Sequence, residues 1–370
     1  MRPDIVVAFT VAIVAAVPAA AQERIDARNG PISVERLTDG LAHPWGMAFL
    51  PDGRMLVTER AGRLRIVSRE GSLSQPLTGV PEVFAEGQGG LLDVVLDPAF
   101  GDNRFVYLSF SEAGGGGAST AVARGRLGPR GLEGTETIFR QEPRIAGDKH
   151  FGSRLAFAPD GTLFVTTGER FQFAPAQDLS NHLGTVLRIN RDGSAPRDNP
   201  FVGRSGAKPE IWSYGHRNIE AAAVHPQTGM LWIGEMGPRG GDELNLPAAG
   251  RNYGWPVVSW GEHYTGEDIP DPPTRPDLAG SIYRWTPVIS PSGMIFYSGE
   301  SFPSWRGNAL IGSLTRRALV RLAIDGQRVT DEEVLDMGAR VRDVEQGLDG
   351  AVYLLTDEDD GSVLRLTPAP

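Results

Sequence analysis

Apolar and polar residues alternate along most of this chain in short runs of four to seven positions, and Gly or Pro separates one run from the next. Alternation with a period of two predicts β-strands buried on one face, and the Gly and Pro between them predict tight turns. No segment repeats apolar residues at helical spacing for more than two turns. We therefore expect a protein built almost entirely from short strands.

One pattern occurs six times along the chain. It begins in residues 44–67 with an apolar strand, a Pro-Asp-Gly turn, a second strand, another glycine turn and a third strand. Similar segments follow at 90–112, 153–170, 221–237, 293–314 and 341–366. Small repeated sheets that cannot bury both faces alone stack around an axis. The repeat therefore predicts an all-β, six-bladed β-propeller with four-stranded antiparallel blades. A β-sandwich with accidental similarity between its strands is the alternative.

Long inserts between the repeats are the expected carriers of chemistry, because the loops on one face of a propeller meet at the mouth of its channel. These inserts lie at 113–152, 171–218 and 238–292. Within the first of them, the glycine run 114–117 has no helix after it, so it predicts a flexible loop and not a phosphate-binding one.

The first residues have the pattern of a secretory signal peptide. Arg2 precedes an apolar run from Ile5 to Val17, and proline and small residues follow up to Ala21. The alternative is a membrane anchor, but the run is shorter than the ~20 residues of a spanning helix. We expect residues 1–21 to be cleaved near Ala21. The mature chain, 22–370, would then be a single propeller domain in the periplasm or the medium, without membrane insertion.

Composition and charge exclude several classes of function. The chain has no Cys, which excludes disulfides, thiolate metal sites and cysteine nucleophiles. Its 36 Lys and Arg against 46 Asp and Glu give a formal charge of −10, so no nucleic-acid partner is expected. The G-x-S-x-G and H-E-x-x-H motifs and the Walker loop are absent.

His150 is the first candidate for chemistry. It lies in the loop GDKHFGSRLAF (147–157), directly before an expected inner strand of the third repeat. A neutral imidazole at the channel mouth suits a general base near neutral pH, because its reference pKa is ~6.5. Asp148 and Glu169 are the candidate carboxylates to orient the ring. The alternative is a loop histidine bonded to the main chain.

The segment 234–256 combines Gly, Pro and acidic residues in an irregular loop. Asp242 and Glu243 supply hard oxygen ligands, and a Gly-Pro turn leaves main-chain carbonyls free. Such a mixture suits Ca²⁺, which takes six to eight oxygens in flexible geometry. An ordinary acidic turn is the alternative.

Arginine and amide side chains stand near other blade entrances. Arg217 and Asn218 precede the fourth repeat, and Gln88 precedes the second. Arg340 and Arg342 are two positions apart, on one side of an expected strand. Inward arginines need anions, and their planar forks match carboxylates, whereas two arginines on an outward strand face are the alternative. Together the candidates indicate a channel mouth that binds a polyanion through Ca²⁺ and arginines, with a hydroxyl-bearing substrate near the imidazole.

These residues give the chain a resemblance to a known family. It resembles the soluble aldose sugar dehydrogenases that depend on pyrroloquinoline quinone (PQQ), in the glucose/sorbosone dehydrogenase family. The similarity runs from Arg36 to Pro368. It is carried in order by PWGMAFLPDG, GQGGLLDVVLDP, HFGSRLAF, AQDLSNHLGTVLRIN, DNPF, EIWSYGHRN, GPRGGDELN, NYGWP, SGMIFY and VRDVEQGLDG. The resemblance implies a six-bladed propeller that holds PQQ and Ca²⁺ over its channel and oxidises aldoses at the anomeric carbon to lactones.

The resemblance also implies a role for each candidate residue. His150 would take the proton of the anomeric hydroxyl as the sugar gives hydride to the quinone, and Arg217 would stabilise the negative charge that arrives. The implied contacts are Gln88 for substrate and cofactor; Tyr264 for substrate; Arg217, Asn218, Thr315, Arg340 and Arg342 for the cofactor; and Gly237, Pro238, Asp242, Glu243 and Tyr253 for calcium.

The sequence departs from the family pattern at one cofactor position. Relatives carry a Lys there, whereas GSLTRR places Thr315 at that point. Arg316 is the neighbouring cation, but on a strand it would point to the opposite face. The change bears on cofactor affinity and not on the fold.

No haem or flavin motif is present, so electrons would leave singly to an external acceptor such as a soluble cytochrome or an assay dye. Two other functions fit a propeller. One is a metal-dependent lactonase that needs Ca²⁺ but no quinone. The other is a non-catalytic propeller that binds glycans or proteins. A neutral glycan gives no reason for a cluster of cations beside His150.

Overall fold

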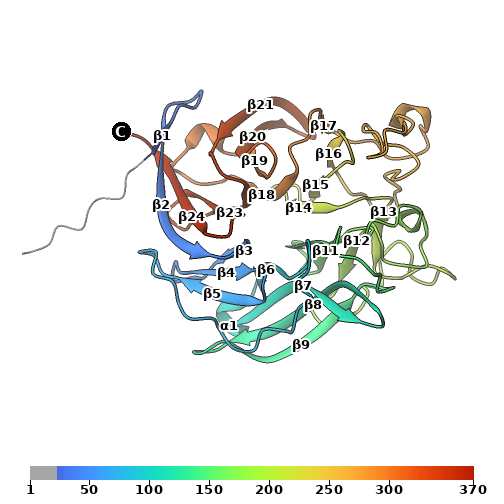
Figure 1. The fold of residues 1–370 in the computed structure, drawn as a ribbon, viewed down its shortest axis with the longest axis horizontal. Coiled ribbons are helices and arrows are strands. Elements are labelled where there is room, and N and C mark those ends of the chain that lie inside the picture. Colours follow the sequence, from blue (N-terminus) through green and yellow to red (C-terminus); the bar gives the residue numbers. More distant parts are fainter. Residues whose placement is uncertain (1–22) are drawn as a thin grey trace, which may run out of the picture.

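The computed structural model describes residues 23–370, and nearly all its elements are β-strands (Figure 1). The expected signal peptide lies outside the described residues. Grouped by sheet, the strands are β3 (Pro44–Phe49), β4 (Met55–Glu59) and β5 (Arg63–Val67); β6 (Leu91–Leu96), β7 (Phe105–Gly114), β8 (Gly117–Leu127) and β9 (Leu132–Arg140); β10 (Gly152–Phe157), β11 (Leu163–Thr167), β12 (Thr185–Ile189) and β13 (Ile211–Tyr214); β14 (Ile219–Val224), β15 (Leu231–Glu235), β16 (Asp242–Asn245) and β17 (Tyr283–Trp285); β18 (Pro291–Phe296), β19 (Ala309–Ser313), β20 (Ala318–Asp325) and β21 (Arg328–Asp336); and β22 (Val341–Gln346), β23 (Val352–Thr356), β24 (Gly361–Pro368), β2 (Ile32–Leu41) and β1 (Glu23–Ile25). The helical pieces are α1 (Phe100–Asn103) and three 3₁₀ turns, Ala174–Gln177, Pro272–Thr274 and Pro303–Trp305.

The six sheets are the blades of a propeller, and we number them 1 to 6 by their innermost strands β3, β6, β10, β14, β18 and β22. These strands contact one another in a closed ring, from β3 round to β22 and back to β3. All strand pairs within a blade are antiparallel. The predicted six-bladed propeller is therefore confirmed, and the sandwich alternative is excluded. In the described part of the chain four blades have four strands, blade 1 has three and blade 6 has five.

Blade 6 is built from both ends of the chain. Strand β2 pairs with β24 from Ile32 opposite Pro368 to Leu41 opposite Gly361. Figure 1 shows this junction as the blue β2 beside the red β24. The ring can therefore open only if the ladder between β2 and β24 separates.

Every innermost strand has a register irregularity near its start, and a bulge of this kind turns a side chain away from the normal alternation. The irregularities lie between Pro44 and Met47, Leu91 and Val94, Gly152 and Leu155, Ile219 and Ala221, Pro291 and Met294, and Val341 and Asp343. The six bulges share one end of the channel, so they aim residues of all blades at the same region.

Apolar clusters fill the space between neighbouring blades. Tyr107 and Val122 of blade 2 pack with Leu155 and Leu187 of blade 3, and all four are buried. Each such side chain contributes roughly 1.5–3 kcal/mol when it is fully removed from water. Stacking thus buries faces that a single blade would leave exposed. Among residues 23–370, no helix has the length and apolar character needed to cross a bilayer.

The expected inserts hold more regular structure than the sequence suggested. The segment 113–152 contains all of β8 and β9, so it completes blade 2. The glycine run is a tight hairpin and not an open loop. Gly114 pairs with Gly117, and Gly115 and Gly116 have φ of +58° and +84°. Two positive φ values in a two-residue turn suit the twist of the flanking strands, and glycine adopts them without strain.

Candidate active site

One cavity of about 500 Å³ lies at the bulged end of the channel and takes residues from all six blades or the loops that precede them. It brings together eleven of the candidate residues: Gln88, His150, Arg217, Asn218, Gly237, Pro238, Asp242, Tyr264, Thr315, Arg340 and Arg342. Glu243 and Tyr253 instead line a small neighbouring cavity of about 20 Å³, which shares Arg217, Met236 and Gly237 with the large one. The expected gathering of these side chains at one channel mouth is therefore present in the structure.

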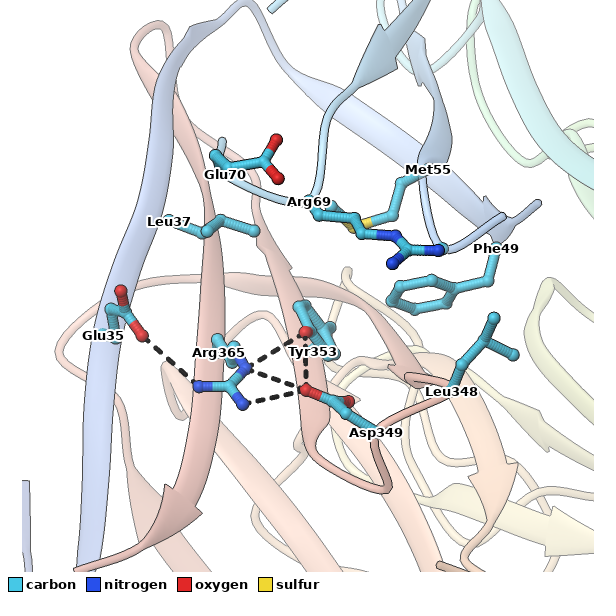
Figure 2. A pocket seen from close by; sticks show the side chains of 11 residues that line it. Glu35, Leu37, Phe49, Met55, Arg69, Glu70, Leu348, Asp349, Tyr353 and Arg365 are labelled. Carbon is cyan, nitrogen blue, oxygen red and sulfur yellow. Dashed lines mark hydrogen bonds and ion pairs between the residues drawn. The ribbon is translucent and has the colours of Figure 1, made fainter. Parts of the chain in front are cut away.

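A second cavity of about 500 Å³ lies at the other end of β3 and β22 (Figure 2). Its polar groups bond mainly to one another: Arg365 donates to Asp349 and is 3.5 Å from Glu35. Phe49 and Tyr353 pack edge to face beside them. None of the candidate residues lines this cavity, so we assign the candidate site to the channel mouth.

His150 is held with its ring in a defined orientation. Its φ of +54° turns the chain sharply, and its N–H donates to Oε1 of Gln88 at 2.6 Å. The buried Glu169 lies 2.5 Å from Nδ1 through Oε1, and its Oε2 accepts the N–H of Phe173. Because Glu169 holds the hydrogen on Nδ1, a neutral ring has its lone pair on Nε2. Of the two carboxylates considered from the sequence, Glu169 and not Asp148 bonds the ring.

The electrostatics favour an uncharged imidazole. Burial lowers the pKa of His150 below its ordinary value, the hydrogen bond to Glu169 opposes this, and the charge of Arg217 lowers it further. A histidine with a lowered pKa is neutral at neutral pH and able to accept a proton.

Arg217 and Asn218 cross-link the loops around the imidazole. The Arg217 guanidinium donates to the carbonyls of Met236 and Gly237, at 2.9 and 2.8 Å, and to the Tyr264 hydroxyl at 3.2 Å. Its Nε is buried without a partner. Asn218 accepts the N–H of Gly152 at 3.0 Å, beside His150, and donates to Glu220.

Arg342 lies in a buried ion network on the cavity wall. It donates to Glu220 at 2.5 Å and to Asp357 at 2.7 Å, while its Nε is buried without a partner. Burial by itself would raise the pKa of Asp357, but the Arg342 guanidinium outweighs it and holds this pKa well below its ordinary value. Arg340 precedes β22, whereas both arginines were expected on one strand; it still reaches Asp357 at 3.4 Å.

Thr315 lies in the turn between β19 and β20, and its hydroxyl donates to the carbonyl of Val288 at 3.2 Å. Arg316 does not line the cavity; its guanidinium faces Pro287 and Glu332. As expected, Arg316 points elsewhere, so it does not supply a cation beside Thr315.

Asp242 ties the 237–242 loop to blade 5. One carboxylate oxygen accepts the N–H of Gly237, and the other accepts those of Ile289 and Ser290, at 2.6 to 2.8 Å. Burial raises the pKa of Asp242 to about 6. The carbonyl of Gly237 already accepts from Arg217, so this proposed calcium ligand is engaged by a guanidinium.

The small cavity holds two carboxylates in close approach. Asn245 Nδ2 donates to both Glu235 and Glu243, at 2.9 and 3.0 Å. Burial, and then the nearby charge of Glu235, raise the pKa of Glu243 to about 8. Tyr253 lines the same cavity and donates its hydroxyl to the carbonyl of Leu246. A cation here would relieve the repulsion between the carboxylates. In the part of the chain the structure describes, no group of three or more His, Cys, Asp or Glu side chains is arranged to hold a metal.

Comparison with known proteins agrees with this geometry. A family model described as Glucose / Sorbosone dehydrogenase matches residues 41–365. The chain belongs to the glucose/sorbosone dehydrogenase family. It is 45% identical over 346 residues to aldose sugar dehydrogenase YliI of Escherichia coli K12, covering 91% of this chain and 93% of that protein. The chain is accordingly an enzyme, a sugar dehydrogenase of the PQQ-type propeller family.

Two solved structures of this family share the fold. The soluble aldose sugar dehydrogenase of Escherichia coli, in its apo form, gives a TM-score of 0.88 at 43% identity and covers 91% of this chain and 100% of that one. The PQQ-bound aldose sugar dehydrogenase of Streptomyces coelicolor gives 0.74 at 28% identity, covering 90% and 98%. The propeller resemblance drawn from sequence motifs is confirmed.

Several cavity residues of this family member were not predicted. Trp45, Arg60, Glu220 and Asp357 all line the cavity. Trp45 and Glu220 occupy the bulges of β3 and β14, so the equivalent position in each repeat was a usable signal. Nothing local to the sequence marks Asp357, whose role depends on Arg342.

Proposed function

We propose that this sugar dehydrogenase uses PQQ and Ca²⁺ to oxidise aldoses at the anomeric carbon, and passes the electrons to an external acceptor. The observation that carries the proposal is the oriented, neutral imidazole of His150 in the same cavity as two arginines whose Nε atoms are buried without an acceptor. Arg217 and Arg342 each have a buried Nε without an acceptor. A buried N–H in that state favours a ligand that supplies an oxygen.

The cavity suits a polyanion such as the tricarboxylate PQQ. Five arginines line it, Arg60, Arg217, Arg239, Arg340 and Arg342, against the three carboxylates Glu220, Asp242 and Asp357. This excess of positive charge is notable in a chain of net charge −10. The PQQ-bound state of the Streptomyces coelicolor relative supports the same assignment.

We assign the cofactor contacts to Gln88, Asn218, Thr315, Arg340 and Arg342, with the last two facing its carboxylates. When bound, PQQ supplies the acceptor for the hydride of the sugar C1–H bond. The guanidinium of Arg217 stabilises negative charge at the site, because it is fixed by the carbonyls of Met236 and Gly237 before the reaction begins.

We assign calcium to two places. Gly237 and Pro238 line the large cavity, and an ion on their main-chain carbonyls would share the Gly237 oxygen with the Arg217 guanidinium and would polarise a cofactor carbonyl. Glu243, Tyr253 and the neighbouring Asp242 would form the second place. The support for it is the close approach of Glu243 to the buried Glu235: burial, and then the charge of Glu235, raise the pKa of Glu243 to about 8. Hard oxygen ligands of this kind favour Ca²⁺.

Nε2 of His150 takes the proton of the anomeric hydroxyl as the C1–H hydride leaves, so that the sugar loses one hydride and one proton, two electrons and two protons in all, and becomes a lactone. Glu169 stabilises the imidazolium that results, through its bond to Nδ1. Gln88 and Tyr264 would contact the sugar. Tyr264 is 55% exposed at the cavity mouth, where a ring can stack on a pyranose.

The first test is reconstitution. We expect purified apoprotein to reduce a dye with glucose or another aldose only after both PQQ and Ca²⁺ are added, because the chain's own residues supply no redox group. PQQ with a chelator is the control. Absence of dye reduction across a broad aldose panel would contradict the proposal. Acid release from gluconolactone by calcium-loaded, PQQ-free protein would instead indicate a lactonase.

The second test is the pH dependence of kcat/KM. The pKa of His150 is lowered, so the base stays unprotonated as pH falls past the ordinary value near ~6.5. We therefore expect the acid limb of the profile to have a midpoint below this value. A Glu169→Gln variant, which no longer offers a carboxylate to the ring, should move the midpoint lower still. An upward shift in that variant would show that Glu169 does not stabilise the imidazolium.

We also propose that residues 1–21 direct the protein out of the cytoplasm. A soluble cytochrome outside the cytoplasm would then accept the electrons. The support is the sequence pattern around Arg2 and Ala21. N-terminal sequencing of the protein from a periplasmic fraction tests the cleavage.

A further inference from the structure

A single buried arginine at the centre of the channel joins five of the six blades. Arg154 lies in the bulge of β10 in blade 3 and is 4% exposed. Its Nη1 is 3.1 Å from Asp93 of blade 2 and 2.8 Å from Asp343 of blade 6. Its Nε donates to the carbonyl of Glu220 in blade 4 at 2.8 Å, and its Nη2 donates to the carbonyl of Arg342 at 2.9 Å. The guanidinium carbon lies 4.2 Å from the ring centre of Trp45 in blade 1.

The groups that Arg154 holds are part of the cavity, although Arg154 itself does not line it. Glu220, Arg342 and Trp45 all line the cavity. Their side chains also meet each other, since Arg342 pairs with Glu220 and lies 5.6 Å from the Trp45 ring centre. Trp45 therefore lies near two guanidinium groups, that of Arg342, which lines the cavity, and that of Arg154, which does not. The main-chain carbonyls that Arg154 binds belong to Glu220 and Arg342. The charged ends of these two side chains form, together with Trp45, one wall of the cavity.

Only an arginine can make this set of contacts. The interactions use all three guanidinium nitrogens, in directions set by the planar fork. A lysine would keep a positive charge near Asp93 and Asp343. Its single nitrogen, however, cannot reach two carboxylates and two carbonyls of different blades at once.

We propose that Arg154 is a positioning residue that fixes the cavity wall formed by Trp45, Glu220 and Arg342. Its two hydrogen bonds to main-chain carbonyls set where β14 and β22 present the Glu220–Arg342 pair. The expected effect of Arg154 on cofactor affinity rests on the proposed function, whereas its positioning of the cavity wall does not.

Blade 5 provides a matched control. Arg321 in β20 is 6% exposed, bonds Glu333 at 2.6 Å and Asn308 at 2.7 Å, and lies 5.7 Å from the Trp305 ring centre. It reproduces the burial, the carboxylate partner and the tryptophan of Arg154, but it does not line or support the cavity. Comparing Arg154→Lys with Arg321→Lys separates positioning of the wall from the general cost of altering a buried arginine.

The first readout is amide hydrogen exchange in apoprotein without PQQ or sugar. We expect Arg154→Lys to increase exchange in peptides covering 217–222 and 340–346 and to leave 318–325 unchanged, with the reverse pattern for Arg321→Lys. If Arg154→Lys does not fold, the neutral triple variant Arg154→Met, Asp93→Asn, Asp343→Asn replaces it. Unchanged exchange in both cavity segments would overturn the proposal.

The second readout is PQQ binding in the presence of Ca²⁺. We expect Arg154→Lys to weaken PQQ affinity by about tenfold or more, the usual effect of losing a hydrogen bond involving a charged group. Turnover at saturating PQQ should stay near the wild-type value, because His150 is not moved. Equal affinity losses in Arg154→Lys and Arg321→Lys would overturn the cofactor part. If wild-type protein binds no PQQ, the proposed function fails, and the exchange result still decides the role of Arg154.

Discussion

Replacing His150 with Asn is expected to lower the turnover of the reconstituted enzyme by about 10²- to 10⁴-fold, the range typical of losing a general base. The amide cannot take the proton of the anomeric hydroxyl. Asn is preferred to Ala because His150 has a φ of +54°, and Asn adopts the left-handed region more readily than other residues with a Cβ. The measurement is steady-state dye reduction with saturating PQQ and Ca²⁺.

His225→Asn is the control for this variant. His225 is also buried, but it packs on Trp232 of blade 4 and Phe296 of blade 5 and does not line the cavity. It should keep near wild-type turnover. PQQ binding to His150→Asn should remain largely intact. A variant that binds PQQ normally and turns over within a few fold of wild type would refute the assignment of His150 as the base.

Arg342→Met is expected to cost about 3–5 kcal/mol of the free energy of unfolding at neutral pH, the usual cost of removing one partner from a buried ion pair. The substitution leaves Glu220 and Asp357 buried without their shared guanidinium. Urea titration of the apoprotein measures the loss. Arg340→Met is the matched control: its guanidinium is 42% exposed and 3.4 Å from Asp357, so its loss should cost less than about 1 kcal/mol.

The loss of unfolding free energy caused by Arg342→Met should also depend on pH. The pKa of Asp357 is depressed in the folded protein, so this carboxylate contributes stability above its unfolded pKa of ~3.9 and loses it as pH falls toward the folded value. The gap in unfolding free energy between wild type and variant should therefore narrow in acid. If the difference in unfolding free energy between wild type and variant stays constant from neutral pH to below ~4, the ion network is not the source of that difference.

The repeating blades were predictable because their signal is local. Each Pro-Asp-Gly or similar turn lies between two alternating runs, and the six segments cover the two innermost strands of each blade, together with the third strand in blades 1 and 6. The closure of the ring was not predictable in this way. Nothing near Ile32 indicates that it pairs with Pro368, more than 300 positions away. Strands β8 and β9 were assigned to an insert because a glycine hairpin and a long strand replace the usual turn.

The site shows the same division between local and distant signals. Motifs identified His150, but the sequence left Asp148 and Glu169 open as its partner, and the fold of the 168–173 loop decides between them. Arg342 was recognised, whereas its partner Glu220 lies 122 positions earlier in the chain. Arg154 was not predicted as a site residue because a buried arginine and a surface arginine look alike in sequence. Only the bulged register of β10 directs it into the channel.

The pairing of β2 with β24 also decides how the molecule can come apart. In a solenoid, repeats at either end can unravel one at a time, since each touches only its neighbours. Here the first and last segments of the chain are partners, and even Ala369 donates to the carbonyl of Pro31. Strands β2 and β24 therefore cannot fray independently of each other, whereas β1 pairs with β2 alone. Denaturation should accordingly be cooperative across all six sheets. Separation of β2 from β24 in blade 6 should be a step in the unfolding of every molecule.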